Sequence, residues 1–385
     1  MNIWIFLFLA SGAFILYVLL GYPLAVAVWA RLAPRPIQKQ FRPQRITIII
    51  PVRNGANWIQ AKIDSLLQSD YPPDLFDILV VSDGSTDGTN DIVQEPKHPR
   101  VRLLALPPGG KATAVTRGLE MVTSDIVVLT DVRQAFDRQA LQKLVACFAD
   151  PSVGVVTGEL IIRAGNTQEE FNTGLYWKYE KWIRRSLNSI NAMLGATGSI
   201  YAIRRAAAAP IPAEILLDDV YLPFIAVFRG YRIYFEVEAK AYDLPTSLNS
   251  EFRRKVRTQA GIYQIIRYFP SLLWPGNRRF VHFFSHKIGR LLLPFALLAL
   301  AVSSFGLPEP WRATMIGAQV AGYGLALADK AIPERTLFKR ISTPLRTFIV
   351  LMAAALSALA ILVLPARTLW KETVVTTPRE DARTN

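Results

Sequence analysis

A short acidic turn follows one of the most apolar runs in the chain. The turn, Asp83-Gly84-Ser85-Thr86-Asp87-Gly88-Thr89, comes directly after residues 76–82, which have the composition of a buried strand. Open α/β sheets bind ligands at the carboxyl ends of their strands, where loop amides and short polar side chains converge. The turn therefore predicts a nucleotide site.

Aspartates are the residues on which acid–base chemistry would have to rest. The chain of 385 residues contains one cysteine, Cys147, and three histidines, so we expect no intrachain disulfide, thiolate metal cluster, zinc site or histidine-based catalysis. Asp131 follows the apolar run 126–130, and Asp218-Asp219 precedes an apolar, helix-like stretch. Carboxylates at these places can act as general bases or hold a hard cation such as Mg²⁺.

The region between these aspartates alternates apolar runs with helical stretches. Strands are expected at 46–50, 76–82, 101–105, 126–129 and 153–157, and helices at 58–67, 88–93, 111–121 and 141–148. This alternation is typical of a mainly parallel sheet with helices on its faces. We therefore expect an α/β fold of the Rossmann-like kind.

Long apolar stretches flank the α/β region. Residues 3–30 exceed the roughly 20 residues that cross a bilayer, and no basic residue precedes them, which favours an uncleaved anchor over a signal peptide. Further spans are expected at 291–307, 313–328 and 347–365, the middle one being short and carrying Gln319. Basic residues beside these stretches place 31–290 in the cytoplasm and both termini on the far side.

The net charge of +14 has several readings. No aromatic and basic nucleic-acid module is evident, so anionic lipid headgroups are the expected partner, with a solvated basic surface as the alternative. Residues 175–185 form an amphipathic helix that would lie either on the sheet or at the membrane surface. Residues 263–286 mix aromatic and basic side chains, which favours helices in the headgroup region over buried ones.

Five motifs in order resemble those of membrane-bound family 2 glycosyltransferases. They are residues 50–54 (Ile-Pro-Val-Arg-Asn), residues 82–89, Gly110-Lys111-Ala112, Leu129-Thr130-Asp131 and Leu217-Asp218-Asp219. The resemblance covers residues 1–305, and cellulose, hyaluronan and chitin synthases share the arrangement. It implies a cytoplasmic GT-A catalytic domain that uses a nucleotide-sugar donor, with a UDP-sugar as the expected one.

The resemblance also implies which residues bind the donor. These are Pro51, Arg53, Asn54, Asp83, Ser85, Lys111, Asp131, Arg254 and Arg257. A simpler role for Asp83 is to cap backbone amides, and the run containing Arg254 and Arg257 also suits a basic membrane flank.

The metal motif of the family departs from its usual form in this chain. The Asp-x-Asp pattern reads Asp131-Val132-Arg133, so Asp131 alone would ligate Mg²⁺ or Mn²⁺, or Arg133 would supply the positive charge instead. The final family motif, Gln-x-x-Arg-Trp, becomes Arg254-Lys255-Val256-Arg257-Thr258. Because the tryptophan normally lies against the acceptor sugar, Thr258 favours transfer of one or a few sugars over long-chain synthesis.

The resemblance implies that Asp219 is the base that deprotonates the acceptor hydroxyl. Thr197, Gly198 and Asp218 would bind the acceptor. An alternative is that Asp218 and Asp219 cap the helix that follows, and both roles can hold together, with Asp218 capping and Asp219 catalysing.

These observations predict an inverting glycosyltransferase of the cell membrane, in the bacterial inner membrane. The acceptor would be a lipid-linked or growing glycan, and envelope-polysaccharide assembly proteins are further expected partners. A processive, exporting polysaccharide synthase and a non-catalytic membrane subunit are the alternatives. The expected divisions are an anchor at 1–30, a catalytic domain at 31–261, interfacial helices at 262–290, membrane helices at 291–365 and a polar tail at 366–385.

Overall fold

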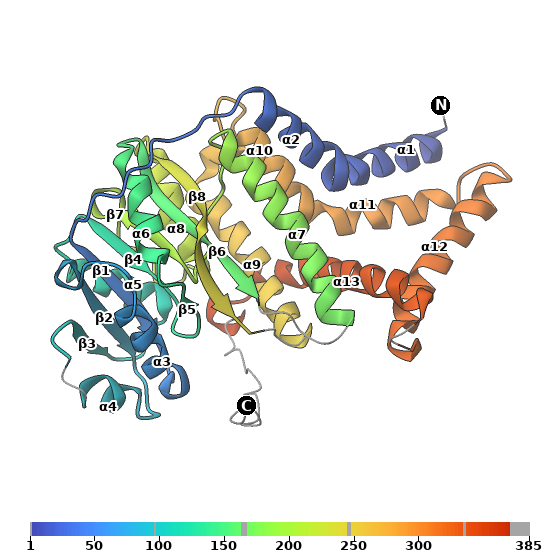
Figure 1. Cartoon of the computed structure of the whole chain (residues 1–385). Coiled ribbons are helices and arrows are strands. Elements are labelled where there is room, and N and C mark those ends of the chain that lie inside the picture. The colour runs from blue at the N-terminus through green and yellow to red at the C-terminus, as the bar shows by residue number, and fades with distance from the viewer. Residues whose placement is uncertain (1, 96–97, 163–167, 245–247, 334–335, 370–385) are drawn as a thin grey trace.

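The sheet and the long apolar helices occupy opposite ends of the molecule (Figure 1). The computed structural model describes residues 2–95, 98–162, 168–244, 248–333 and 336–369. The expected polar tail falls outside the described residues from position 370 onward.

Eight strands form one sheet in the order β3-β2-β1-β4-β7-β6-β8-β5. Its first half is parallel and consists of β1 (Ile46–Val52), β2 (Phe76–Asp83), β3 (Val101–Leu106) and β4 (Ile126–Leu129). β1 and β4 are rich in β-branched residues and buried on both faces, as parallel strands covered by helices must be. The helices of this half are α3 (Ala56–Leu67), α4 (Thr89–Gln94) and α5 (Lys111–Glu120).

The second half of the sheet contains both parallel and antiparallel strand pairs. The sequence predicted a mainly parallel sheet and did not indicate these antiparallel pairs. β7 (Tyr201–Arg204) runs antiparallel to both β4 and β6 (Val153–Ile162), and β8 (Arg232–Asp243) runs parallel to β6. The short β5 (Ala135–Phe136) pairs antiparallel with the end of β8. The helix α6 (Ala140–Ala146) and the 3-10 turn η3 (Cys147–Ala149) pack beside these strands.

Successive residues of the strands point into two separate cores. Ile49, Val81 and Leu129 belong to the core on one face of the sheet, whereas Ile48 and Val128 belong to the core on the other. This alternation follows from the two-residue period of a strand. Both faces of the sheet are therefore packed against a core, and the loops at the carboxyl ends of its strands start from well-packed strands.

Three helices of the described chain are long and apolar enough to cross a membrane: Ile3–Leu32, Phe280–Ser304 and Leu337–Leu362. Ile3–Leu32 comprises α1 (Ile3–Leu16), η1 (Tyr17–Gly21) and α2 (Tyr22–Leu32), and the second comprises α10 (Phe280–Phe283), η6 (Phe284–Ile288) and α11 (Gly289–Ser304). The third contains α13 (Leu337–Ser357) and η8 (Ala358–Leu362). Apolar side chains on them remain exposed, as lipid-facing surfaces require.

Three details differ from the expected spans. The last candidate span is Leu337–Leu362 rather than 347–365, because the helix begins earlier than expected. The second span begins at Phe280 rather than 291, because helix continues through residues expected to be interfacial. Residues 313–328 lie in α12 (Trp311–Ala328), which is helical but is not among the three candidate spans. Figure 1 shows α1 and α11 side by side, with α12 and α13 beyond them.

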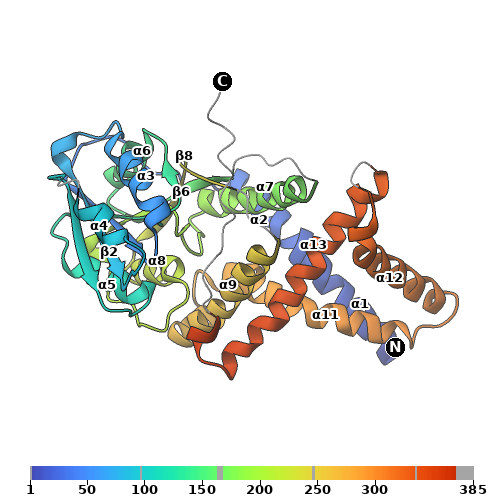
Figure 2. The same ribbon diagram turned by 90° about the horizontal axis from the view of Figure 1, so that it is seen from below.

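Two further helices join the sheet to the apolar bundle (Figure 2). α7 (Gln168–Ser189) contacts β8 and also α2 and α13, so the packing on the sheet considered for residues 175–185 is present, while placement at the membrane surface stays a prediction. α9 (Leu248–Tyr268) packs against α13 and is followed by η5 (Pro270–Leu273).

Headgroup placement of 263–286 stays a prediction, but part of that segment is buried in the protein, as in the alternative considered for it. Phe269, Leu272 and Phe283 are buried because they pack into the core beside α8 (Asp218–Phe228). Trp274, by contrast, is 70% exposed.

Candidate active site

The loops after β1 and β2 are joined to each other by the side chain of Asn54. Its side-chain Oδ1 accepts a hydrogen bond from the backbone amide of Thr86 at 2.9 Å, and its backbone amide donates to Ser85 Oγ at 3.1 Å. Asn54 has a φ of 51°, a left-handed conformation that asparagine tolerates better than most residues. Two motifs that are far apart in sequence therefore form one loop surface beside Pro51.

Asp83 holds the turn that leads into α5. Its Oδ1 accepts hydrogen bonds from the amides of Gly109 at 2.6 Å and Gly110 at 3.0 Å, and its Oδ2 also lies 3.0 Å from the Gly110 amide. Gly110 has a φ of 91°, which favours glycine, and Lys111 follows it as the first residue of α5. The capping role considered for Asp83 is thus present, while direct contact with a donor stays a prediction.

Lys111 connects two of the expected site carboxylates. Its Nζ lies 2.9 Å from Asp131 Oδ1 and 3.1 Å from Asp218 Oδ1. Burial acts to lower the pKa of Lys111, but the charges of Asp131, Asp218 and Asp219 outweigh it and raise the pKa above its ordinary value. The ammonium group therefore stays charged at the centre of the cluster.

Asp219 is a half-buried carboxylate that is held in place by a hydrogen bond. Its Oδ2 accepts a hydrogen bond from the Gly198 amide at 3.0 Å. Burial and the neighbouring charge of Asp218 raise the pKa of Asp219 to about 6, against the opposing effect of Lys111. A carboxylate with such a pKa can accept a proton near neutral pH.

Asp218 and Asp219 lie at the start of a helix, as the capping alternative requires, but neither occupies the N-cap position. Both lie in the first turn of α8, and the N-cap position belongs to Leu217, without a side-chain capping bond. The two carboxylates turn instead toward Lys111 and Gly198.

Helix α9 packs closely against the segment that precedes Asp218 and Asp219. A Cβ at Gly261 would lie 2.4 Å from Leu217 Cγ, so only glycine permits this approach. Gln264 Oε1 also accepts a hydrogen bond from the Leu216 amide at 2.9 Å. The same helix brings Arg257 near enough for its charge to lower the pKa of Asp219.

Arg133 is engaged by a residue that sequence reasoning missed. Its Nε and Nη2 donate to the two carboxylate oxygens of Asp243, at 3.0 and 2.7 Å. Gln134 Nε2 also donates to Asp243 Oδ2 at 2.8 Å. Because Asp243 neutralises Arg133, this arginine is occupied within the protein and is poorly placed to replace a metal ion.

Three other residues near the cluster also escaped the sequence analysis. Lys62 is buried, and its Nζ donates to Thr130 Oγ1 at 2.7 Å and to the Gln134 carbonyl at 2.5 Å, which anchors the segment carrying Asp131. Tyr201 is buried beside the carboxylates, and burial with their charges raises its pKa well above the ordinary value. Arg184 Nη1 donates to Thr197 Oγ1 at 2.7 Å.

Of these overlooked residues, only Lys62 has a local sequence pattern that could have indicated its role. Lysine in an otherwise apolar helix face at position 62 marks a side chain that needs buried partners. The partners of Arg133 and Arg184 come from distant strands and loops, so local sequence gave no sign of them.

The described residues contain no group of three or more histidine, cysteine, aspartate or glutamate side chains arranged to hold a metal ion. Asp131 has 40% of its side chain exposed, and one of its oxygens faces Lys111. Such a site suits an ion that takes one protein carboxylate and draws its other ligands from phosphate and water.

The remaining expected residues are distributed around the cluster. Thr197 donates its amide to Thr157 Oγ1 at 2.8 Å, next to Gly198. Arg53 is exposed at the loop surface beside Asn54. Arg254 lies on α9, where its carbonyl accepts a hydrogen bond from Thr258 Oγ1 at 2.8 Å.

Comparison with known proteins places this site in context. Residues 47–209 match the family model described as "Glycosyl transferase family 2". A poly-beta-1,6-N-acetyl-D-glucosamine synthase from Staphylococcus aureus (strain MSSA476) is 24% identical over 229 residues, which are 57% of this chain and 55% of that protein. A synthase of the same name from Staphylococcus epidermidis is 23% identical over the same shares. The chain thus matches about half the length of these relatives.

One solved structure shares most of the architecture. A mannosyltransferase from Pyrobaculum calidifontis, in complex with GDP-Man and Mn²⁺, aligns with a TM-score of 0.68 and 22% identity. The alignment covers 91% of this chain and 99% of that one. At this identity the likeness establishes a common fold.

Proposed function

We propose that this chain transfers a sugar at the membrane surface, because residues 47–209 match the glycosyl transferase family 2 model and the described part of the chain holds three helices long and apolar enough to cross a membrane. The donor is a nucleotide sugar and the product has an inverted anomeric configuration. The single observation that carries the proposal is the cluster in which Lys111 lies 2.9 Å from Asp131 and 3.1 Å from Asp218, with Asp219 adjacent. A cation and a base with a raised pKa are what this transfer requires.

The donor lies over the loops joined by Asn54, with its diphosphate toward Lys111 and Asp131. Pro51, Arg53, Ser85 and Asp83 surround the nucleoside, and Arg254 and Arg257 approach from α9. We propose that Asp131 holds one Mg²⁺ or Mn²⁺, which neutralises diphosphate charge when bound; the P. calidifontis mannosyltransferase binds Mn²⁺ with its donor. A UDP-sugar is the first donor to test.

The chemical step is a direct displacement assisted by Asp219. The acceptor hydroxyl oxygen attacks the anomeric carbon and forms the new glycosidic bond while the bond from that carbon to the diphosphate oxygen breaks. The proton of the hydroxyl passes to the Asp219 carboxylate, and the electron pair of the broken bond leaves with the nucleoside diphosphate. Lys111 stabilises the negative charge that develops on the leaving group.

Thr197 and Gly198 stand on the acceptor side of Asp219. The amide of Gly198 keeps the carboxylate facing this loop, and a Cβ at that position would lie 3.1 Å from Asp219 Oδ2. The absence of a side chain therefore leaves room for a sugar to approach the base.

We place the catalytic domain, residues 31–261, on the cytoplasmic side, because basic residues flank the apolar helices there. The N-terminus then lies on the far side. With α12 crossing, the C-terminus also lies on the far side; with three crossings it returns to the cytoplasm. Labelling of single cysteines at Asn2 and at Thr368, which follows the last span, in intact cells would distinguish these arrangements.

The proposal is tested by incubating the purified full-length protein with UDP-, GDP- and dTDP-sugars, membrane lipid extract and Mg²⁺. Mass analysis should find one donor whose sugar is transferred in a Lys111-dependent manner. Failure of every donor to be bound, transferred or hydrolysed would contradict the proposal. Product length separates transfer of a few sugars from processive synthesis of a polymer; the staphylococcal relatives are named as synthases of poly-beta-1,6-N-acetyl-D-glucosamine.

A further inference from the structure

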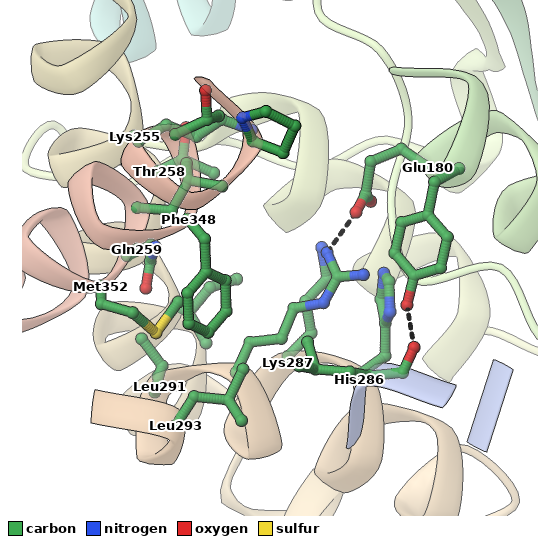
Figure 3. Close-up of a pocket in the computed structure, with 17 residues that line it drawn as sticks. Glu180, Lys255, Thr258, Gln259, His286, Lys287, Leu291, Leu293, Phe348 and Met352 are labelled. Atoms are coloured by element: carbon green, nitrogen blue, oxygen red, sulfur yellow. Dashed lines mark hydrogen bonds and ion pairs between the residues drawn. The ribbon is translucent and has the colours of Figure 1, made fainter. Parts of the chain in front are cut away.

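A cavity lies where α7 and α9 meet the candidate membrane spans. Its volume is about 390 Å³, within the range of small-molecule sites. It does not include Asp131, Asp218 or Asp219, so it is distinct from the carboxylate cluster. Figure 3 shows Glu180 and His286 on the side of the cavity opposite Phe348 and Met352.

The wall of the cavity changes from apolar to charged. The apolar part comes from all three candidate spans and includes Leu19, Leu291, Leu293, Phe348, Leu351 and Met352. The charged part comes from α7, α9 and the start of the second span and includes Glu180, Lys255, Lys287 and Arg290. A ligand that fills this space must therefore be amphipathic.

The charged part carries more positive than negative groups. Arg290 Nη1 lies 2.5 Å from Glu180 Oε1. Burial acts to raise the pKa of Glu180, but the charges of Arg290, Lys255 and Lys287 outweigh it and hold the pKa below its ordinary value. Three cations thus surround one carboxylate, an imbalance that favours an anionic ligand.

Two polar groups of this wall lack partners within the described residues. Lys287 makes no hydrogen bond or ion pair there, although it is only partly exposed. The Oε1 of Gln259, which is buried, accepts no hydrogen bond from the described part of the chain. Buried polar groups are nearly always satisfied, so the Gln259 oxygen points to a ligand with a donor atom, while the Lys287 ammonium group is available to an acceptor atom of the same ligand.

The cavity is linked to the carboxylate cluster by α7 and α9. On α7, Arg184 donates to Thr197 Oγ1 beside Gly198, and the charges of Asp219 and Glu180 both act on this arginine, partly offsetting the burial that lowers its pKa. On α9, Lys255 and Thr258 line the cavity while Arg257 acts on Asp219.

We propose that the cavity binds the phosphate or diphosphate head group of a membrane lipid, whose hydrocarbon chain lies along the apolar wall. Lys287, Lys255 and Arg290 contact the phosphate, as cations do in such sites. The lipid carries the acceptor, which it presents toward Asp219. This last step rests on the proposed function, whereas binding of the lipid does not.

The test uses the purified full-length protein in detergent and measures binding by native mass spectrometry. The probes are a prenyl phosphate, a phosphatidic acid, the matching prenyl alcohol and inorganic phosphate. We expect either phosphate lipid to bind at least about tenfold more tightly than the alcohol or inorganic phosphate. The stronger of the two phosphate lipids identifies the class of natural ligand.

Lys287→Met should weaken binding of the phosphate lipid about tenfold, while Lys287→Arg should retain it. The matched control is Lys143→Met, since Lys143 pairs with Glu238 at the surface of the catalytic domain and should leave lipid binding unchanged. Equal binding of phosphate lipid and alcohol, equal binding of inorganic phosphate, or unchanged binding in Lys287→Met would overturn the inference.

Donor binding by the unaltered protein without lipid gives a separate readout. Donor binding without phosphate-lipid binding would contradict the cavity assignment alone. Lipid binding without donor binding or hydrolysis would contradict the proposed function alone.

Discussion

The Asp219 carboxylate accepts a hydrogen bond from the backbone amide of Gly198, with 3.0 Å between Oδ2 and nitrogen. This bond connects the first turn of α8 to the loop before β7. It fixes one oxygen of the carboxylate, so that the direction of the other is set by the backbone rather than by side-chain rotation. A general base gains from such fixed orientation.

Activity should fall as the pH decreases through about 6. Burial and Asp218 raise the pKa of Asp219 to about 6, and protonation below this value removes the base. Lys111 opposes that shift, so Lys111→Met should move the acid side of the profile to higher pH and lower turnover by about 10²-fold or more. The measurement is kcat/KM against pH for both proteins; an unmoved acid limb in the variant would count against this coupling.

Arg133 should prove structural rather than donor-binding. Arg133→Gln leaves Asp243, which has 8% of its side chain exposed, without its bidentate partner. Loss of one partner of a buried pair costs about 3 kcal/mol, so thermal unfolding should occur at lower temperature. The donor KM should change less than about threefold, because this interaction is not with the donor.

The partner substitution supplies the control for Arg133. Asp243→Asn combined with Arg133→Gln should recover much of the lost stability, because no unpaired charge remains. A tenfold or larger rise in donor KM, with stability unchanged, would instead assign Arg133 to the diphosphate.

Gly261→Ala should reduce both stability and turnover. The added Cβ would meet Leu217 Cγ at 2.4 Å, so α9 must move away from the loop carrying Asp218 and Asp219. Overpacking of this kind costs about 1–3 kcal/mol. The matched control is Gly317→Ala in α12, where nothing lies within 4 Å of the new Cβ, and alanine should be neutral or slightly stabilising there. Equal effects of the two substitutions would argue against the contact.

Removal of divalent metal should abolish most transfer. Asp131 is the expected protein ligand, and EDTA treatment should lower turnover by about 10²-fold, with recovery on adding Mg²⁺ or Mn²⁺. Asp131→Asn should raise the metal concentration needed for half-maximal activity. Full activity after exhaustive EDTA treatment would show that Lys111 alone supplies the positive charge.

The sequence predicted the part of the fold whose signals are local. The apolar runs of β1, β2 and β4 and the turn at Asp83 placed the carboxyl edge of the sheet correctly. The resemblance named Lys111, Asp131 and Asp218 as site residues, but only the structure shows that Lys111 pairs with both aspartates. The mixed half of the sheet was not predicted, because the antiparallel pairing of β7 with β4 and β6 joins strands that are far apart in sequence, β6 and β7 being separated by α7.

The sequence did not predict which side chains contact one another across the fold, as Arg133 and Phe269 illustrate. Nothing near Arg133 indicates that Asp243, at the end of β8, would bind it. The aromatic run around Phe269 looked interfacial because composition does not distinguish a ring facing lipid from one packed on α8. Burial of such a ring is decided by tertiary contacts, which only the structure shows.

The stability of Asp219→Asn provides a control for the role of this residue. The folded-state pKa of about 6 exceeds the ordinary value of 3.8, so ionisation of Asp219 destabilises the folded protein as pH rises between these values. Asparagine should therefore stabilise the protein above pH 6, by up to about 3 kcal/mol, with the gain shrinking toward pH 4. Loss of activity in this variant would then not reflect unfolding.

The most direct test of the account is the single-turnover rate of Asp219→Asn with saturating donor and acceptor. If Asp219 is the base, the rate should fall by about 10² to 10⁴-fold while donor affinity stays within a few-fold of the unaltered protein. A rate close to that of the unaltered protein, with the fold intact, would contradict the assignment of Asp219 as the base.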